Sequence, residues 1–193
     1  MTRPKILVFA GSIRTGSHNA RLAALATKLL AFADAEPIRI SLQDFPLPLY
    51  DGDLEAKSGP PEHAANLARM MAQHAGIFIA TGEYNASVTP LLKNTIDWIS
   101  RVREGADAPR AAFRNRIFAL AAASPGTLGG YRGLMAVRQV LELGLGATVL
   151  PEQVAVRDAA NAFGPDENLT DPRTAEQLHA LLRRLVDAAR YLA

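Results

Sequence analysis

Cysteine is absent from this 193-residue sequence. Its absence excludes disulfide bonds, catalysis by a thiolate, and zinc or iron–sulfur sites that cysteine would hold. A chain of this length does not need such cross-links, because a domain of its size buries roughly 70% of the surface that it exposes when unfolded. We therefore expect residues 1–193 to form a single domain.

Excess charge of either sign and long hydrophobic runs are lacking too. The 21 lysines and arginines nearly balance 19 aspartates and glutamates, the formal net charge is +2, and no run of basic residues occurs. This balance gives no reason to expect a nucleic-acid partner. The apolar run at residues 5–10 is too short for the core of a signal peptide, and nothing approaches the roughly 20 residues of a membrane span. We expect a cytoplasmic protein without a membrane span.

Two kinds of catalytic site find little support in the sequence. The four histidines are scattered and show no H-x-x-x-H or H-E-x-x-H spacing, so we expect no metal site. Ser12 and Ser124 lack the G-x-S-x-G setting of a hydrolase nucleophile, which argues against a serine hydrolase.

Short apolar runs that suit buried parallel strands alternate with amphipathic stretches that suit helices. The predicted strands are residues 5–10, 38–41, 76–81, 116–123 and 147–150, and the predicted helices are residues 17–33, 60–74, 89–103, 130–143 and 171–191. This alternation predicts right-handed βαβ units and an α/β fold with a parallel sheet. Five strands suit a flavodoxin-like doubly wound sheet of order 2-1-3-4-5, with helices on both faces and the ligand between strands one and three.

The loop at residues 11–19 has the composition of a phosphate site. Gly11 and Gly16 permit a tight turn, Arg14 can form charge-assisted hydrogen bonds to a phosphate dianion, and the helix that follows offers N–H groups. Further hydrogen-bonding side chains in the loop are Ser12, Thr15, Ser17 and Asn19. The glycine spacing matches neither the dinucleotide motif G-x-G-x-x-G nor the P-loop. The loop predicts a site for one phosphate monoester; the alternative is an ordinary turn in which Ser17 or Asn19 caps the helix.

Two further loops follow the third and fourth predicted strands. Residues 82–90 include a carboxyl group, an aromatic ring and an amide in Glu83, Tyr84 and Asn85, before a helix that Thr89 could cap. Such a loop suits the polar edge of a planar heterocycle. Residues 124–130 include three glycines, which indicate positive φ angles or a close approach of the backbone to a neighbour. A capped turn and a flexible turn are the alternatives for these two loops.

The three loops gain weight from their placement. Each follows a central strand of the predicted sheet, so all three open at the same edge. One suits a phosphate group and two suit a flat polar ring, which together describe a mononucleotide.

The chain resembles the NADPH-dependent FMN reductases of the flavodoxin-like superfamily, which include bacterial quinone, chromate and azo-dye reductases. The matching motifs are Gly11-Ser12-x-Arg14-x-Gly16-Ser17-x-Asn19, Glu83-Tyr84-Asn85, Leu92-Lys93-Asn94-x-Ile96-Asp97-Trp98-x-Ser100-Arg101, Ser124-Pro125-Gly126 with Gly129-Gly130, Arg138-Gln139, and Pro48-Leu49-Tyr50 with Asp53. The resemblance spans roughly residues 5–152. One departure is Gly82, where the family usually has proline, and this glycine would loosen the loop.

The resemblance implies FMN as cofactor, with the phosphate on the loop at residues 11–19, the isoalloxazine facing residues 83–85, and residues 124–130 beside the ring. The expected cofactor-binding residues are Ser12, Arg14, Ser17, His18, Asn19, Gly82, Glu83, Tyr84, Asn85, Ser124, Gly126, Gly129 and Gly130. NADPH or NADH would be the co-substrate, passing a hydride to flavin N5, and a small acceptor such as a quinone would then leave with the electrons in a ping-pong cycle. This chemistry belongs to the flavin, so no catalytic side chain is expected.

Two other functions remain open at this point. A flavodoxin-like electron carrier would bind FMN without reacting with nicotinamide, although such carriers tend to be acidic and this chain is not. The other possible function is an interaction module, in which the same fold no longer binds flavin. The intact phosphate loop argues against this function.

The predicted helix at residues 89–103 has two interpretations. Trp98 and Ile99, with Asn94, Asp97 and Arg101, could be a core stripe beside a solvated face. The resemblance implies instead that this helix packs against its twin in a dimer, since Trp and Arg are favoured at interfaces. We expect a homodimer or homotetramer, with the loop at residues 48–53 of a partner completing the site.

Overall fold

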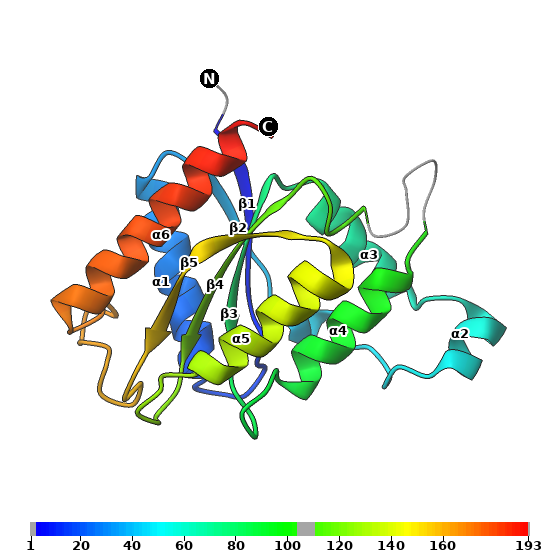
Figure 1. Ribbon diagram of the computed structural model, residues 1–193, viewed down its shortest axis with the longest axis horizontal. Coiled ribbons are helices and arrows are strands. Elements are labelled where there is room, and N and C mark those ends of the chain that lie inside the picture. Colours follow the sequence, from blue (N-terminus) through cyan, green and yellow to red (C-terminus); the bar gives the residue numbers. More distant parts are fainter. Residues whose placement is uncertain (1–2, 104–110, 193) are drawn as a thin grey trace.

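The computed structural model describes residues 3–103 and 111–192, and a parallel five-stranded sheet lies at its centre (Figure 1). The strands are β1 (Lys5–Ala10), β2 (Glu36–Arg39), β3 (Gly76–Thr81), β4 (Ile117–Ala123) and β5 (Thr148–Val156). The helices are α1 (His18–Phe32), α2 (Gly52–Ser58), α3 (Glu62–Ala72), α4 (Pro90–Arg101), α5 (Tyr131–Gln139) and α6 (Pro172–Arg190). A 3-10 helix at Leu42–Asp44 and a π-helical turn at Val140–Gly144 complete the regular elements.

The strand order is β2-β1-β3-β4-β5, and all four pairings are parallel. The prediction of a flavodoxin-like doubly wound sheet is therefore confirmed. The chain reverses its direction across the sheet after β2, so β1 and β3 form the switch point at which such folds bind ligands.

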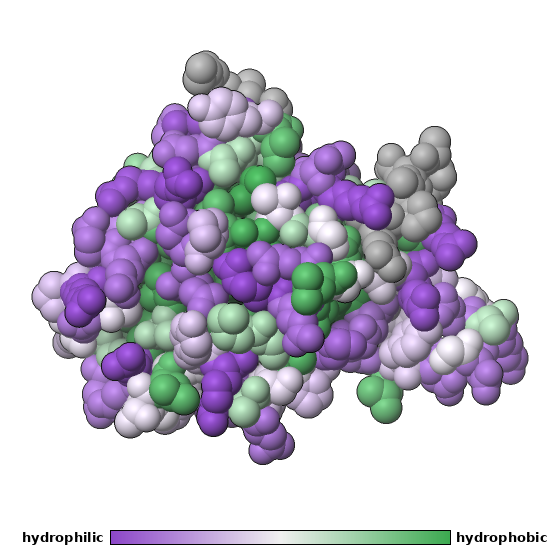
Figure 2. Space-filling view, viewed as in Figure 1, coloured by the Kyte–Doolittle hydropathy of each residue, from purple (hydrophilic) through white to green (hydrophobic). Residues whose placement is uncertain are grey.

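Helices cover both faces of the sheet (Figure 1). Ile6 and Val8 of β1 belong to a buried cluster with α1 and α6, whereas Leu7 and Phe9 belong to a second cluster on the other face, with α3, α4 and α5. Successive residues of a strand point to opposite faces, which is why a continuous apolar run is needed. Figure 2 shows a mainly hydrophilic surface over the helices, with separate hydrophobic side chains at the lower edge, where the strands end.

Two strands differ from their predicted bounds by more than one residue, and each of them contains a proline. β2 lies at Glu36–Arg39 rather than at 38–41 and includes Pro37, which an edge strand tolerates because its outer N–H groups are not paired. β5 continues to Val156, although the prediction ended it at Leu150, before Pro151. The register shifts between Phe118 and Leu120, so Pro151 lies in a bulge that needs no donated hydrogen bond.

The sequence interpretation missed helix α2. Asp51 caps it, accepting hydrogen bonds from Asp53 N at 2.8 Å and Leu54 N at 3.5 Å. Gly59, at φ +71°, ends it. An aspartate before the segment and a glycine after it are visible in the sequence as possible caps. The segment nevertheless has no apolar stripe, and none of its residues is buried, so its helix lacks the usual sequence signal.

Within residues 3–103 and 111–192, no helix is both long and apolar enough to cross a bilayer.

Candidate cofactor site

The loops after β1, β3 and β4 surround a cavity of about 370 Å³ at the carboxyl edge of the sheet. Nine of the expected residues line it: Ser12, Arg14, Ser17, His18, Asn19, Gly82, Glu83, Tyr84 and Ser124. The other expected residues, Asn85, Gly126, Gly129 and Gly130, do not. Thr89, Ala123 and Pro125 line the cavity as well, without having been expected there. The fold thus brings three loops together, and contact between their residues and FMN stays a prediction.

The loop at residues 11–19 ends in the capped start of α1. Ser17 is the N-cap, accepting a 3.4 Å hydrogen bond from Ala20 N, so the capping alternative holds. The N–H groups of His18 and Asn19 lie in the first turn, where a helix offers them no internal acceptor. No acidic residue lies in that turn, so the positive end of the helix dipole is not opposed there. Capping and anion binding are therefore compatible at this helix start.

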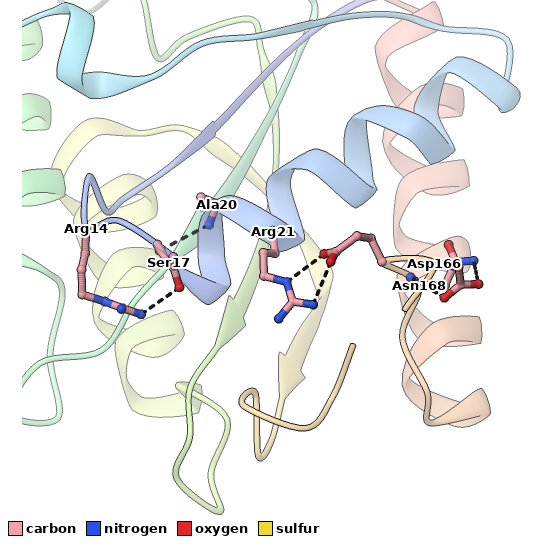
Figure 3. A network of polar contacts seen from close by, with 8 residues as sticks. Arg14, Ser17, Ala20, Arg21, Asp166 and Asn168 are labelled. Carbon is pink, nitrogen blue, oxygen red and sulfur yellow. Dashed lines mark hydrogen bonds and ion pairs between the residues drawn. The ribbon is translucent and has the colours of Figure 1, made fainter. Parts of the chain in front are cut away.

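Arg14 and His18 add the polar side chains of this end of the cavity. The Arg14 guanidinium donates to Thr15 O at 3.1 Å and Gly16 O at 3.2 Å, so it is turned back toward its own loop (Figure 3). Nδ1 of His18 is buried and has no hydrogen-bond partner among the described residues. Burial, together with repulsion from Arg14 and Arg21, holds the pKa of His18 below its usual value. A dianion beside these groups would relieve that repulsion and raise the pKa of His18.

Helix α1 is braced on its outer side by Arg21. This side chain forms two hydrogen bonds with the Glu167 carboxylate, at 2.8 and 3.1 Å, and reaches from α1 to the turn at residues 164–168 (Figure 3). Its guanidinium also lies 4.5 Å from the centre of the Phe163 ring. The bidentate pair restrains the orientation of α1, whose first turn forms the floor of the cavity.

Two buried side chains join the loop after β1 to its neighbours. Thr89, the N-cap of α4, donates to Gly11 O at 2.8 Å and accepts from Leu92 N. Asn19, 6% exposed, donates to Ala123 O at 3.0 Å and accepts from Ala123 N at 2.8 Å. The amide of Asn19 is therefore engaged by the end of β4, and this residue positions the cavity wall.

The loop after β3 is a tight two-residue hairpin. Tyr84 and Ser87 exchange two backbone hydrogen bonds, and the residues between them, Asn85 and Ala86, have φ angles of +50° and +62°. Two successive positive φ angles describe a type I′ turn, in which asparagine is favoured. Asn85 thus has a conformational role, and the exposed Tyr84 beside it lines the cavity.

Glu83 links the loop after β3 to helix α5. Its carboxylate pairs with Arg132, with Nε at 2.8 Å, and accepts a 3.1 Å hydrogen bond from Gly133 N. Helix α5 has no side-chain cap of its own, so Glu83 caps it from a distance in sequence of about 50 residues. Gly133 permits this contact, because a Cβ there would lie 2.8 Å from Gly82 O. Arg132 and Gly133 were not singled out from the sequence, which carries no signal for so distant a cap.

We expect Glu83 to contribute stability that is lost in acid. Burial alone raises its pKa, but the hydrogen bonds from Arg132 and Gly133 outweigh that effect and hold the pKa below the usual 4.5. The unfolded chain therefore binds more protons between the two pKa values, and the stabilisation, complete above pH 4.5, falls as the pH drops through the folded value. In urea unfolding, the difference between wild type and Glu83→Gln should be constant above about pH 5 and should shrink below it. A difference that does not vary with pH would contradict this role.

The glycines after β4 serve close packing of the backbone. Gly129 and Gly130 have φ angles of +61° and +88°. A Cβ on Gly129 would lie 2.9 Å from the carbonyl carbons of Ala155 and Val156, and one on Gly130 would lie 2.8 Å from Ala122 Cβ. Gly129 and Gly130 therefore combine positive φ angles with a close approach of the backbone to its neighbours. These neighbours are β5 for Gly129 and β4 for Gly130.

The loop before α2 is held on helix α4. Pro48 O accepts hydrogen bonds from Asn94 Nδ2 at 2.9 Å and from Trp98 Nε1 at 2.8 Å, and Asn94 Oδ1 accepts from Tyr50 N. The Tyr50 hydroxyl receives a 2.8 Å hydrogen bond from Arg101. Trp98 is 0% exposed, so its ring is covered by this chain and offers no area to a partner. The core interpretation therefore holds for Trp98, and a homodimer or homotetramer stays a prediction that this residue does not support.

The chain is similar to several known proteins. The family model described as NADPH-dependent FMN reductase matches residues 4–161. A quinone reductase of Escherichia coli K12 is 33% identical over 172 residues, which cover 89% of this chain and 84% of that protein. An NAD(P)H-dependent FMN reductase of Pseudomonas aeruginosa is 32% identical over 182 residues, covering 94% and 92%.

Among solved structures, the flavoenzyme FerB of Paracoccus denitrificans, an NAD(P)H:(acceptor) oxidoreductase, superimposes with a TM-score of 0.79. It shares 26% sequence identity, and the match covers 97% of this chain and 98% of that one. The fold, the cavity and the extent of these matches lead to one conclusion: the chain belongs to the family of NADPH-dependent FMN reductases, flavin enzymes that oxidise NAD(P)H.

Proposed function

We propose that the cavity at residues 11–19, 82–89 and 123–125 holds FMN, and that the enzyme passes electrons from NAD(P)H to a quinone-like or other small acceptor in a ping-pong cycle. The convergence of three loops on one cavity, with phosphate-binding groups at one end, carries this proposal. Escherichia coli and Pseudomonas relatives named for quinone and FMN reduction support the choice of acceptor class.

The groups that line the cavity fit FMN. At one end, Ser12, Arg14 and Ser17 offer hydroxyl and guanidinium donors beside the first turn of α1, a combination that suits a phosphate dianion. The unpartnered Nδ1 of His18 is a polar atom that the described chain leaves without an acceptor or donor. At the other end, Gly82, Tyr84 and Ser124 bring backbone and aromatic surface suited to a flat ring.

When bound, FMN supplies the redox chemistry, taking a hydride from nicotinamide and returning electrons to the acceptor. The residues of this chain bind and orient; no side-chain nucleophile is required. Tyr84, 56% exposed at the mouth of the cavity, would contact whichever substrate enters. Since both substrates would use the same opening, one must leave before the other enters, which gives ping-pong kinetics.

The first experiment is a visible spectrum of the purified protein with and without added FMN, followed by anaerobic NADPH. Flavin absorption that bleaches with NADPH and returns with a quinone supports the proposal. Absorption that persists with NADPH and NADH would indicate an electron carrier, and a protein that binds no FMN on titration would overturn the proposal. Parallel initial-rate lines at several quinone concentrations are the expected sign of ping-pong kinetics.

Replacing Arg14 with alanine should weaken FMN binding about 10- to 100-fold, since a charge-assisted hydrogen bond contributes about 1.5–3 kcal/mol. Titration followed by flavin fluorescence measures the dissociation constant. Riboflavin, which has no phosphate, is the matched ligand, and its affinity should change little. If both ligands lose affinity equally, Arg14 shapes its loop and does not bind the phosphate.

A further inference from the structure

A second cavity, of about 820 Å³, lies beside the cofactor cavity. We call it the β5–α6 cavity, because the end of β5, the segment that follows it and the start of α6 form most of its wall. The side chains that decide its chemistry are Leu128, Tyr131, Arg157, Asp158, Asp171 and Arg173. Its volume is within the range of about 300–1,000 Å³ that small-molecule sites occupy. Neither the phosphate loop nor the residues expected to contact FMN line it.

The two cavities share a wall. Ser124, which lines the cofactor cavity, donates its N–H to Val156 O at 3.1 Å and accepts at its own carbonyl from Ala159 N at 3.2 Å. Val156 in turn lines the β5–α6 cavity. Both cavities therefore lie at the carboxyl edge of the sheet, on either side of the loop at residues 124–130.

Two arginines and two aspartates line the β5–α6 cavity, and the arginines are Arg157 and Arg173. Among the described residues, neither Arg157 nor Arg173 forms an ion pair, and both are exposed. Asp158 accepts hydrogen bonds from Asn161 Nδ2, and Asp171 caps α6 by accepting from Thr174 N at 2.9 Å. The hydrogen bonds from Thr174 and, to a smaller extent, the charge of Arg173 hold the pKa of Asp171 below its usual value.

Apolar side chains line the same cavity. Leu128 and Tyr131 are 46% and 48% exposed, and both line the cavity. An exposed leucine and an aromatic ring at the mouth of a polar cavity offer contact to a flat heterocycle. A flat apolar contact together with two exposed guanidinium groups suits a phosphorylated adenosine.

We propose that the β5–α6 cavity holds the adenosine end of NADPH, with the base against Leu128 and Tyr131 and the 2′-phosphate bound by Arg157 and Arg173. The inference rests on the proposed function, since it places the far end of the same nicotinamide substrate. The hydroxyl group that NADH has in place of this phosphate is neutral and forms no ion pair with a guanidinium, so the two arginines select NADPH.

The direct test is calorimetric titration of the purified protein with adenosine 2′,5′-bisphosphate and with 5′-AMP. The bisphosphate should bind at least about tenfold more tightly, and Arg157→Ala and Arg173→Ala should each weaken it by about tenfold, since one charged hydrogen bond contributes at least 1.4 kcal/mol. The matched control is Arg114→Ala, which removes an exposed arginine that does not line the cavity and should leave bisphosphate binding unchanged. In steady state, the ratio of kcat/KM for NADPH to that for NADH should fall by a similar factor in the two cavity variants only.

Equal affinity of the wild type for both nucleotides, or bisphosphate binding that neither cavity variant weakens, would overturn the inference. Because binding is measured without turnover, its failure is distinct from that of the proposed function. A protein that binds no FMN but binds the bisphosphate through Arg157 and Arg173 keeps this site and loses the reductase proposal. One that bleaches with NADPH but binds the bisphosphate regardless of both arginines loses only this site.

Discussion

Replacing Gly129 with alanine is expected to lower the free energy of unfolding by about 3 kcal/mol, from backbone strain of 1–3 kcal/mol and a steric overlap of similar size. Gly129 has a φ of +61°, where an L-residue with a Cβ is disfavoured. The added carbon would lie 2.9 Å from the carbonyl carbons of Ala155 and Val156. These atoms belong to β5 and cannot move aside as a flexible side chain could, so the loop at residues 124–130 must shift.

Gly144→Ala is the matched control for this substitution. Gly144 ends the π-helical turn with no atom within 4 Å of its added Cβ, and its φ lies outside the left-handed region. We expect this variant to match wild type or to gain up to about 1 kcal/mol, because alanine restricts the unfolded chain more than glycine does. Urea unfolding of both variants gives the comparison. Equal effects at the two positions would contradict the packing role assigned to Gly129.

Asn19→Ala is expected to cost about 2–4 kcal/mol of stability, since it leaves two buried backbone groups without partners. Asn19 satisfies both the N–H and the carbonyl of Ala123, which is 3% exposed. The same change should weaken FMN binding, because it frees the loop after β1 from the end of β4. Thermal unfolding with and without FMN measures both effects.

Two further variants define the origin of this loss. Asn66→Ala removes a half-buried asparagine from α3 and should change stability by less than about 0.5 kcal/mol. Asn19→Asp keeps an acceptor for Ala123 N but places an oxygen against Ala123 O, so it should restore little of the loss. An aspartate variant as stable as wild type would show that hydrogen bonding to Ala123 is not what makes Asn19 important.

The strands were predictable where apolar runs have clear ends. Residues 5–10 and 76–81 were placed at the bounds that β1 and β3 have, because glycine or a charged residue flanks each run. The predicted fifth strand ended at Leu150, and only the pairing with β4 shows that Pro151 falls in a bulge and that the strand continues beyond it. Local propensity therefore predicts where a strand lies, whereas a register defect depends on the neighbour.

The location of the candidate site was predictable for a topological reason, since loops after central parallel strands meet at one edge. The roles of single residues in the site were not predictable from the sequence. The sequence suggested that Glu83 contacts the flavin ring, but in the structure its carboxylate accepts a hydrogen bond from Gly133 N. The sequence also suggested that Asn19 binds the phosphate, but its side-chain amide donates to Ala123 O. These partners lie 50 and 104 residues away, so no local pattern could have revealed them.

The two anchors of the loop after β1 also bear on the kinetics of cofactor binding. Hydrogen bonds within the chain itself join Gly11 of this loop to Thr89, and Asn19 to Ala123. Little conformational entropy remains to be lost on binding, so affinity should vary among variants mainly through the rate at which FMN leaves. Hydrogen exchange offers a direct view: the amide of Ala123 should already be protected in the flavin-free protein, and adding FMN should slow its exchange only slightly.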